Sequence, residues 1–226
     1  MLPEHTLKSF DKDLHKLYTN ILDMFSKSRL QINIVFECLK DASGEDLNHS
    51  TKDIIGYKKE AKIIEDRINR LCIKILSLRN PLAGDLRFVF AATHIANNLG
   101  LISDLTHKII KNINELSTYE VEQDILNSCI EMITEEIKLL QIVENMFTGV
   151  DTTLLNNSYH ALDDNIDLIY KKVNNAVFRQ YSQKDYSGNY NSLSMYLYIA
   201  KKLENIGDYC INIIKYIYFI EYSNLE

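Results

Sequence analysis

The most regular pattern in the chain lies near its end, where apolar residues recur at alternating steps of four and three. The residues in this series are Ile199, Leu203, Ile206, Cys210, Ile213, Ile217 and Ile220. Steps of three and four return side chains to one face of an α-helix. The pattern therefore predicts a long helix that packs its apolar face against other helices.

The same spacing predicts five further long helices before this one. Their expected spans are residues 7–39, 46–79, 86–116, 121–147 and 152–181. Pro81 and Gly84 are expected to separate the second helix from the third, with Asp85 as the N-terminal cap of the third. Gly149 is expected in the turn after the fourth helix. A chain with only two prolines and seven glycines is typical of an all-α protein built from antiparallel helices.

An internal repeat organises these six helices. Residues 94–111 align with residues 198–215 at an offset of 104, with eight identities in eighteen positions. Shared helical patterning accounts for part of this agreement, but the matched Asp104 and Asp208 are polar. We therefore predict two pseudo-symmetric antiparallel three-helix bundles, one in residues 1–116 and one in residues 117–226.

Oxygen-bearing side chains form a stripe beside the apolar face of the last helix. Glu204, Asp208 and Asn212 are spaced by four, and so are Asp163 and Asp167 in the preceding helix. Carboxylates spaced by four repel each other on a helix, and a cation offsets that repulsion. If the two helices are antiparallel neighbours, these five residues predict a site for Mg, Mn, Fe or Zn. The alternative is a solvated helix face.

The first repeat departs from this acidic pattern. Lys58 and Lys62 stand where the second repeat has its aspartate pair, at an offset of 105. Gly100 replaces the glutamate and Lys108 the asparagine, so that only Asp104 remains. Two lysines opposite one aspartate favour an ion pair. We therefore predict a single metal cluster, in the second repeat only.

Composition narrows the function classes. A formal charge of −6 argues against a nucleic-acid binder, which normally has a basic face. The four cysteines are isolated and form no Cys-x-x-Cys pair, which argues against a zinc knuckle or a disulfide framework. We find no run long and apolar enough to span a membrane and expect a soluble, cytoplasmic protein.

The sequence contains few of the residue patterns that enzymes use for catalysis. Asp104 and His107 form half of a carboxylate-x-x-His motif, but a di-iron site of the ferritin type needs two such motifs. There is no recognisable Ser-His-acid arrangement and no glycine-rich phosphate loop. A metal-dependent enzyme using the same carboxylates ranks well below a binding protein. A metal-free helical scaffold is the third hypothesis.

Four segments stand out when the chain is considered as a whole: the stretch 10–24, the turn 81–87 (Pro-Leu-Ala-Gly-Asp-Leu-Arg), the run 163–167, and residues 203–208 (Leu-Glu-Asn-Ile-Gly-Asp) with Asn212. Together they resemble the PhoU family of bacterial regulators of phosphate uptake. The resemblance covers essentially the whole chain. It implies two three-helix repeats and, in several members, multinuclear metal clusters on paired carboxylates spaced by four.

The resemblance also implies a function. It implies a non-enzymatic cytoplasmic adaptor, often dimeric, that couples the phosphate ABC transporter to a sensor histidine kinase and restrains the phosphate-starvation response. Such a protein would reach the membrane only through its partners. The family's metal-binding motif falls on Asp163, Asp167, Glu204, Asp208 and Asn212 in this sequence.

Overall fold

A computed structural model describes residues 8–41, 47–119, 122–150, 158–182 and 189–222. Six long helices make up nearly all of this part of the chain, and none of it is β-strand. In chain order the helices are α1 (Lys8–Lys40), α2 (Leu47–Arg79), α3 (Ala83–Leu116), α4 (Gln123–Thr148), α6 (Ser158–Tyr181) and α7 (Tyr190–Tyr222). The predicted all-α fold of six long helices is confirmed.

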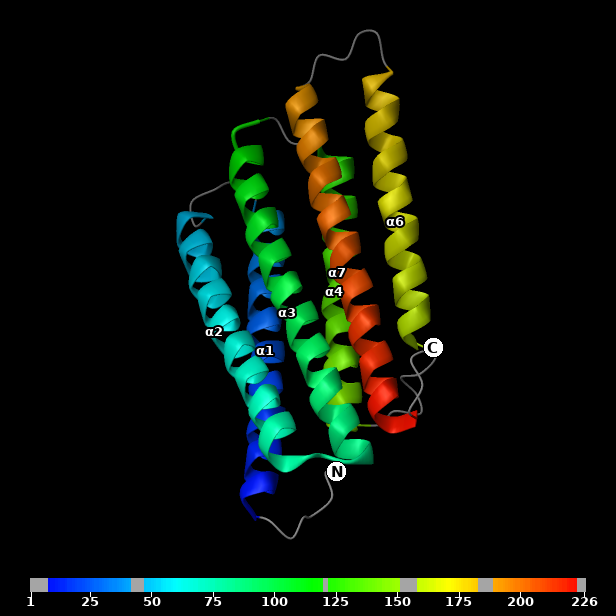
Figure 1. The fold of residues 1–226 in the computed structure, drawn as a ribbon. Helices are drawn as coiled ribbons and strands as arrows, with labels where there is room; N and C mark the ends of the chain where they lie inside the picture. Colours follow the sequence, from blue (N-terminus) through cyan, green and yellow to red (C-terminus); the bar gives the residue numbers. More distant parts are fainter. Residues whose placement is uncertain (1–7, 42–46, 120–121, 151–157, 183–188, 223–226) are drawn as a thin grey trace.

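The helices form two groups of three that lie side by side (Figure 1). Within the first group α1, α2 and α3 all contact one another, and α4, α6 and α7 do so in the second. The groups meet where α3 packs against α7 and α1 packs against α4. The helices α2 and α6 therefore lie at opposite edges, outside a central set of four helices (Figure 1).

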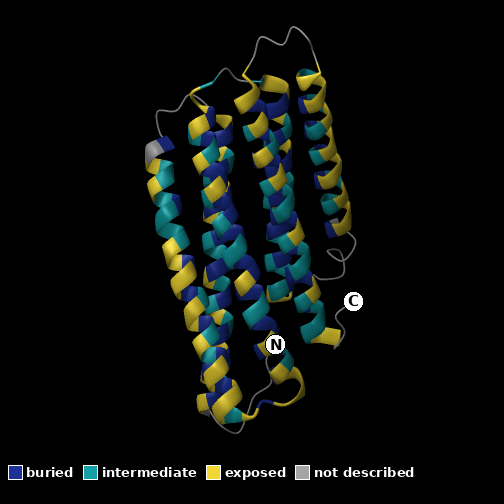
Figure 2. Cartoon of the chain, turned by 45° about the horizontal axis from the view of Figure 1, so that its top comes forward, coloured by how far each residue is buried: buried dark blue, intermediate teal, exposed yellow. Residues whose placement is uncertain are grey.

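Each helix is placed by the apolar series along one side. Leu14, Leu17 and Ile21 of α1 are completely buried. In α7 the predicted series is buried up to Ile217, whereas Ile220 near the end of the helix is half-buried. Figure 2 shows buried and exposed positions alternating along the helices, with the exposed residues outermost. Burial of these apolar side chains is the main favourable contribution to folding.

The helix ends correct one detail of the sequence interpretation. The helix α3 begins at Ala83, so Gly84 and Asp85 lie inside its first turn. Leu82 occupies the capping position and makes no side-chain capping bond, so the expectation that Asp85 caps the helix is wrong. Asp85 is instead buried, and its acidic side chain lies near the positive end of the helix dipole.

All four cysteines are buried and free, as expected from their isolated positions. Within the described residues, no helix has the length and hydrophobicity needed to cross a bilayer.

Two glycines give opposite predictions for stability. Gly149 ends α4 with φ +74°, whereas Gly56 lies inside α2, and a Cβ atom at either position would meet nothing within 4 Å. Alanine at position 149 must adopt a left-handed conformation, so Gly149→Ala should lower the free energy of unfolding by about 1–2 kcal/mol. Gly56→Ala should raise it by about 0.5–1 kcal/mol, because alanine loses less backbone entropy. Urea denaturation measures both changes, and equal effects would contradict this account.

Candidate metal centre

The acidic pairs predicted from the sequence lie on helices that are neighbours in space. The helices α6 and α7 pack against each other (Figure 1). The charge of Asp208 on α7 acts on Asp163 of α6, as does the charge of Asp167 one turn along α6. The structure therefore brings carboxylates of both pairs together, as the antiparallel arrangement predicted.

These residues lie at the rim of the bundle. Asp163, Glu204 and Asn212 are half-buried, whereas Asp167 and Asp208 are exposed. We call the five residues the acidic patch. Asn212 follows Asp208 by one turn of α7 at the end of the patch. An ion from solvent can therefore reach the outer carboxylates without any rearrangement of the core.

Crowding of like charges changes the proton affinity of the patch. The pKa of Asp163 is raised above its usual value, first because burial disfavours the charged form and second because Asp167 and Asp208 repel it. A bound cation would reverse this effect, because it stabilises the ionised carboxylates.

One member of the patch already has a cationic neighbour. Lys201 donates a hydrogen bond to the carboxylate of Glu204 one turn away on α7, and its ammonium group lies 5.4 Å from the ring centre of Tyr170. The lysine is largely exposed, so the pair contributes little to stability. A metal ion at Glu204 would compete with this lysine.

The carboxylates are near one another but not gathered around one point. Among the described residues, no group of three or more His, Cys, Asp and Glu side chains is arranged to hold a metal ion. Helical side chains such as Asp and Glu change rotamer readily, so the outer carboxylates can turn toward an ion. The backbone places the ligands, and their final orientation would depend on the ion.

Sequence reasoning missed one acidic residue at this site. Glu136 of α4 is fully buried and is acted on by the charges of Asp163, Asp208 and Glu204. The sequence contained a signal for this residue, because Met132 and Leu140, each four positions away, belong to the apolar face of the same helix. A glutamate on an apolar helix face is uncommon unless something compensates its charge.

The environment of Glu136 strongly favours its neutral form. Its pKa is raised well above the usual value, chiefly by burial and then by the negative charge of Asp163. The nearby backbone of Gly207 offsets part of this rise by favouring the ionised form, but neither oxygen has a hydrogen-bond partner of ordinary geometry among the described residues. A cation bound here would satisfy these oxygens. The acidic patch together with Glu136 offers only oxygen ligands, which suit Mg, Mn or Fe and are also found around Zn.

The first repeat confirms the predicted ion pair. Lys58 Nζ lies 2.9 Å from Asp104 Oδ1, and Lys62 Nζ lies 3.2 Å from Glu65 Oε2. The same part of the fold therefore carries lysine–carboxylate pairs in the first repeat, whereas in the described part of the second repeat Asp163 and Asp208 have mainly carboxylate neighbours. His107 stands beside this pair, and burial together with the charge of Lys58 lowers its pKa.

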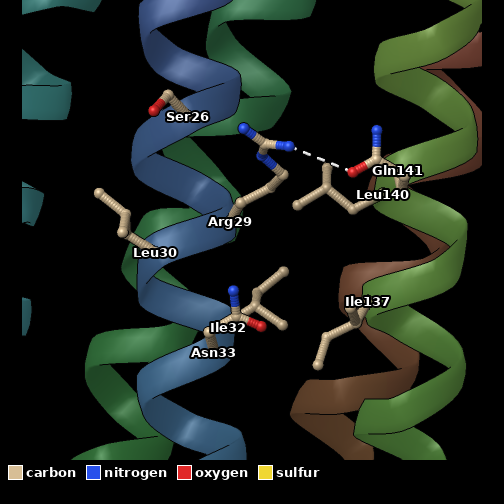
Figure 3. Close-up of a pocket in the computed structure, with 8 residues that line it drawn as sticks. All are labelled: Ser26, Arg29, Leu30, Ile32, Asn33, Ile137, Leu140 and Gln141. Atoms are coloured by element: carbon tan, nitrogen blue, oxygen red, sulfur yellow. Dashed lines mark hydrogen bonds between the residues drawn. The ribbon is translucent and has the colours of Figure 1, made fainter.

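A separate pocket of about 210 Å³ lies between α1 and α4, where the two repeats meet (Figure 3). Arg29 donates a hydrogen bond to Gln141 Oε1 at 3.1 Å, and its Nε atom lies 3.1 Å from Glu144 Oε2. The charge of this arginine is therefore already matched. The pocket lacks the unpaired positive charge of an anion site, and we assign it no function.

The protein is thus an all-α bundle of two groups of three helices, with neighbouring carboxylates on α6 and α7 of the second group. A family model described as "PhoU domain" matches this chain twice, at residues 21–113 and 129–217. The two matches cover most of the chain. The protein therefore belongs to the PhoU family.

Individual relatives agree with this assignment. The chain is 30% identical over 224 residues to a phosphate-specific transport system accessory protein PhoU homolog of Zymomonas mobilis, covering 95% of this chain and 87% of the relative. It is 24% identical over 218 residues to the accessory protein PhoU of Escherichia coli, covering 96% and 87% of the two chains.

Solved structures support the fold. The crystal structure of PhoU from Pseudomonas aeruginosa matches with a TM-score of 0.83 at 21% identity, covering 95% of this chain and all of the other. The phosphate transport system regulatory protein PhoU from Streptococcus pneumoniae matches with a TM-score of 0.72 at 18% identity, covering 96% and 99% of the two chains.

The raised pKa of Glu136 predicts a pH dependence of stability. Above the usual glutamate pKa of 4.5, the unfolded chain loses this proton while the folded chain keeps it. The folded state then binds more protons, so the free energy of unfolding falls as pH rises from 4.5 toward the folded pKa. Glu136→Gln should remove this part of the slope and make the metal-free protein more stable at pH 7. Urea denaturation in EDTA from pH 5 to 8 measures the slope, and an unchanged slope would contradict the prediction.

Proposed function

We propose that this protein regulates phosphate uptake as an accessory protein of a phosphate ABC transporter. The observation that carries the proposal is the extent of the family match, which runs through both repeats and spans most of each relative's length. The relatives in Zymomonas mobilis and Escherichia coli are named as accessory proteins of the phosphate-specific transport system. A shared fold alone would not support this function.

The proposed mechanism is that of an adaptor. The protein acts in the cytoplasm as a homodimer, binds subunits of the transporter, and contacts a sensor histidine kinase. When phosphate is plentiful, this complex restrains the phosphate-starvation response. The protein makes and breaks no covalent bond, in keeping with the word "accessory" in its relatives' names. Its membrane association is indirect, through the transporter.

The acidic patch is proposed to be the metal-binding part of this adaptor. The residues Asp163, Asp167, Glu204, Asp208 and Asn212 would hold one or more ions of Fe, Mn, Mg or Zn in the second repeat only. A bound ion supplies positive charge. The chain's own carboxylates, held on α6 and α7, would join the two helices along the rim and shape the surface offered to a partner. The support is the mutual repulsion at Asp163 and the unpartnered oxygens of buried Glu136.

Removing two carboxylates of α7 should abolish metal binding. The double variant Glu204→Ala/Asp208→Ala loses ligands from the rim, where neither side chain is part of the apolar core. Elemental analysis of protein purified without chelator should find near-stoichiometric metal in the unmodified protein and none in the variant. Circular dichroism should show unchanged helix content.

The matched control is Asp104→Ala in the first repeat. Asp104 corresponds to Asp208 but pairs with Lys58, so its removal should leave the metal content unchanged. Metal retained in the double variant would exclude the acidic patch as the site. Metal lost from the Asp104→Ala variant as well would contradict its restriction to the second repeat.

Deleting the protein tests its regulatory role. A reporter of the phosphate-starvation response should become active at high phosphate in the deletion strain, and the unmodified gene should restore repression. Affinity purification at high phosphate should recover transporter subunits and the kinase with the tagged protein. A reporter that stays repressed in the deletion strain would refute the negative role. Recovery of neither partner would refute the adaptor mechanism.

A further inference from the structure

Glu136 and Asp13 are both buried carboxylates, but the charges of their neighbours are opposite in sign. Asp13 of α1 is 5% exposed, and Lys74 Nζ donates to its two oxygens at 2.8 and 2.9 Å. Arg79 adds a second cation at 3.6 Å. Glu136 is 0% exposed and faces Asp163, Glu204 and Asp208 in place of cations. A buried charge without a partner is strongly unfavourable, so this position calls for either a proton or a metal ion.

Gly207 connects Glu136 to the acidic patch. A Cβ atom at position 207 would lie 3.1 Å from Glu136 Oε1 and 3.7 Å from Asp163 Oδ1. The buried carboxylate of α4 and the half-buried carboxylate of α6 therefore approach the same point on α7, where the Cδ1 atom of Ile166 also lies within 3.7 Å. A side chain at position 207 would crowd Glu136, so glycine lets oxygens from two other helices come close to the backbone of α7.

In the first repeat, a neutral side chain occupies the position that corresponds to Glu136. Gln31 stands at the position of Glu136, at an offset of 105, and is also completely buried. Its Nε2 atom donates a hydrogen bond to Ser103 Oγ at 2.9 Å, and Ser103 corresponds to Gly207 at an offset of 104. A neutral amide with a hydroxyl partner thus occupies the first repeat. The second repeat has a carboxylate and a glycine, which offer charge and space.

We propose that Glu136 is a ligand of the metal site, contributed by a third helix. This inference rests on the proposed metal-binding function of the acidic patch and extends it inward. An ion next to Gly207 would take oxygens from α4, α6 and α7, through Glu136, Asp163 and Asp208. The ligand class is a hard divalent or trivalent cation, because every donor is a carboxylate oxygen. Because α4 also packs against α1, the ion would join the rim of the second repeat to the centre of the molecule.

The test is a titration of metal-free protein with Mn²⁺, followed by isothermal calorimetry and by the change in melting temperature. Glu136→Gln keeps the size of the side chain and removes its charge. We expect this variant to bind Mn²⁺ at least tenfold more weakly or to lose one equivalent of ion. We also expect a smaller rise in melting temperature with Mn²⁺, because only ions that bind the folded state stabilise it.

A neighbouring residue provides the matched control. Glu135 lies on the same helix, is partly exposed, and pairs with Lys138 at 2.9 Å. Glu135→Gln removes the same charge outside the patch and should bind Mn²⁺ like the unmodified protein. Equal loss of binding in both variants would indicate a general effect of charge and would overturn the inference.

The outcomes separate the inference from the function on which it rests. If the unmodified protein and Glu136→Gln bind Mn²⁺ with the same stoichiometry and affinity while Asp208→Ala loses it, the acidic patch stands and Glu136 is a buried neutral acid. If the unmodified protein binds no Mn²⁺, both the metal site and the role of Glu136 are refuted. The regulatory role is tested independently by the starvation reporter.

Discussion

The packing of α3 against α7 holds the two groups of three helices together, with a smaller contribution from α1 against α4. Each of these helices buries adjacent residues, such as Ile109 with Ile110 in α3 and Ile213 with Ile214 in α7. Adjacent residues point about 100° apart, so both helices need neighbours on more than one side. The other helices of a three-helix unit cannot cover all of this apolar surface. The two repeats therefore share one core, with α2 and α6 left at the edges.

This shared core determines where charge can accumulate. The edge helix α6 places Asp163 beside Gly207 of α7, while the central helix α4 carries the buried Glu136. In the interior a carboxylate is weakly solvated, and each neighbouring negative charge adds to the cost of ionising it. The carboxylates of the candidate centre thus become more buried from the rim inward, from the exposed Asp167 and Asp208 to the fully buried Glu136. Lys201 at the surface matches only the outer part of this charge.

The two repeats have the same helix arrangement but carry different polar side chains at corresponding positions. In the first repeat these polar side chains pair with one another: Lys58 with Asp104, and Gln31 with Ser103. The second repeat leaves carboxylates without such partners at the corresponding positions. The helix packing tolerates both sets, because these side chains lie beside the apolar series and do not replace it. A repeat with internally paired charges needs no ion, whereas the proposed metal ion would stabilise the other.

Sequence alone was enough to predict the helices, the apolar faces, the acidic pairs and the lysines that interrupt the pattern in the first repeat. Each of these follows from a helical period of 3.6 residues, which is local and can be read along the chain. The contact between Glu136 of α4 and Gly207 of α7, more than seventy positions later, became visible only in the folded chain. The folded chain also shows that Asp85 is buried inside α3 and does not cap it. Contacts between helices depend on their pairing and on the register in which they pack, and a local period contains neither.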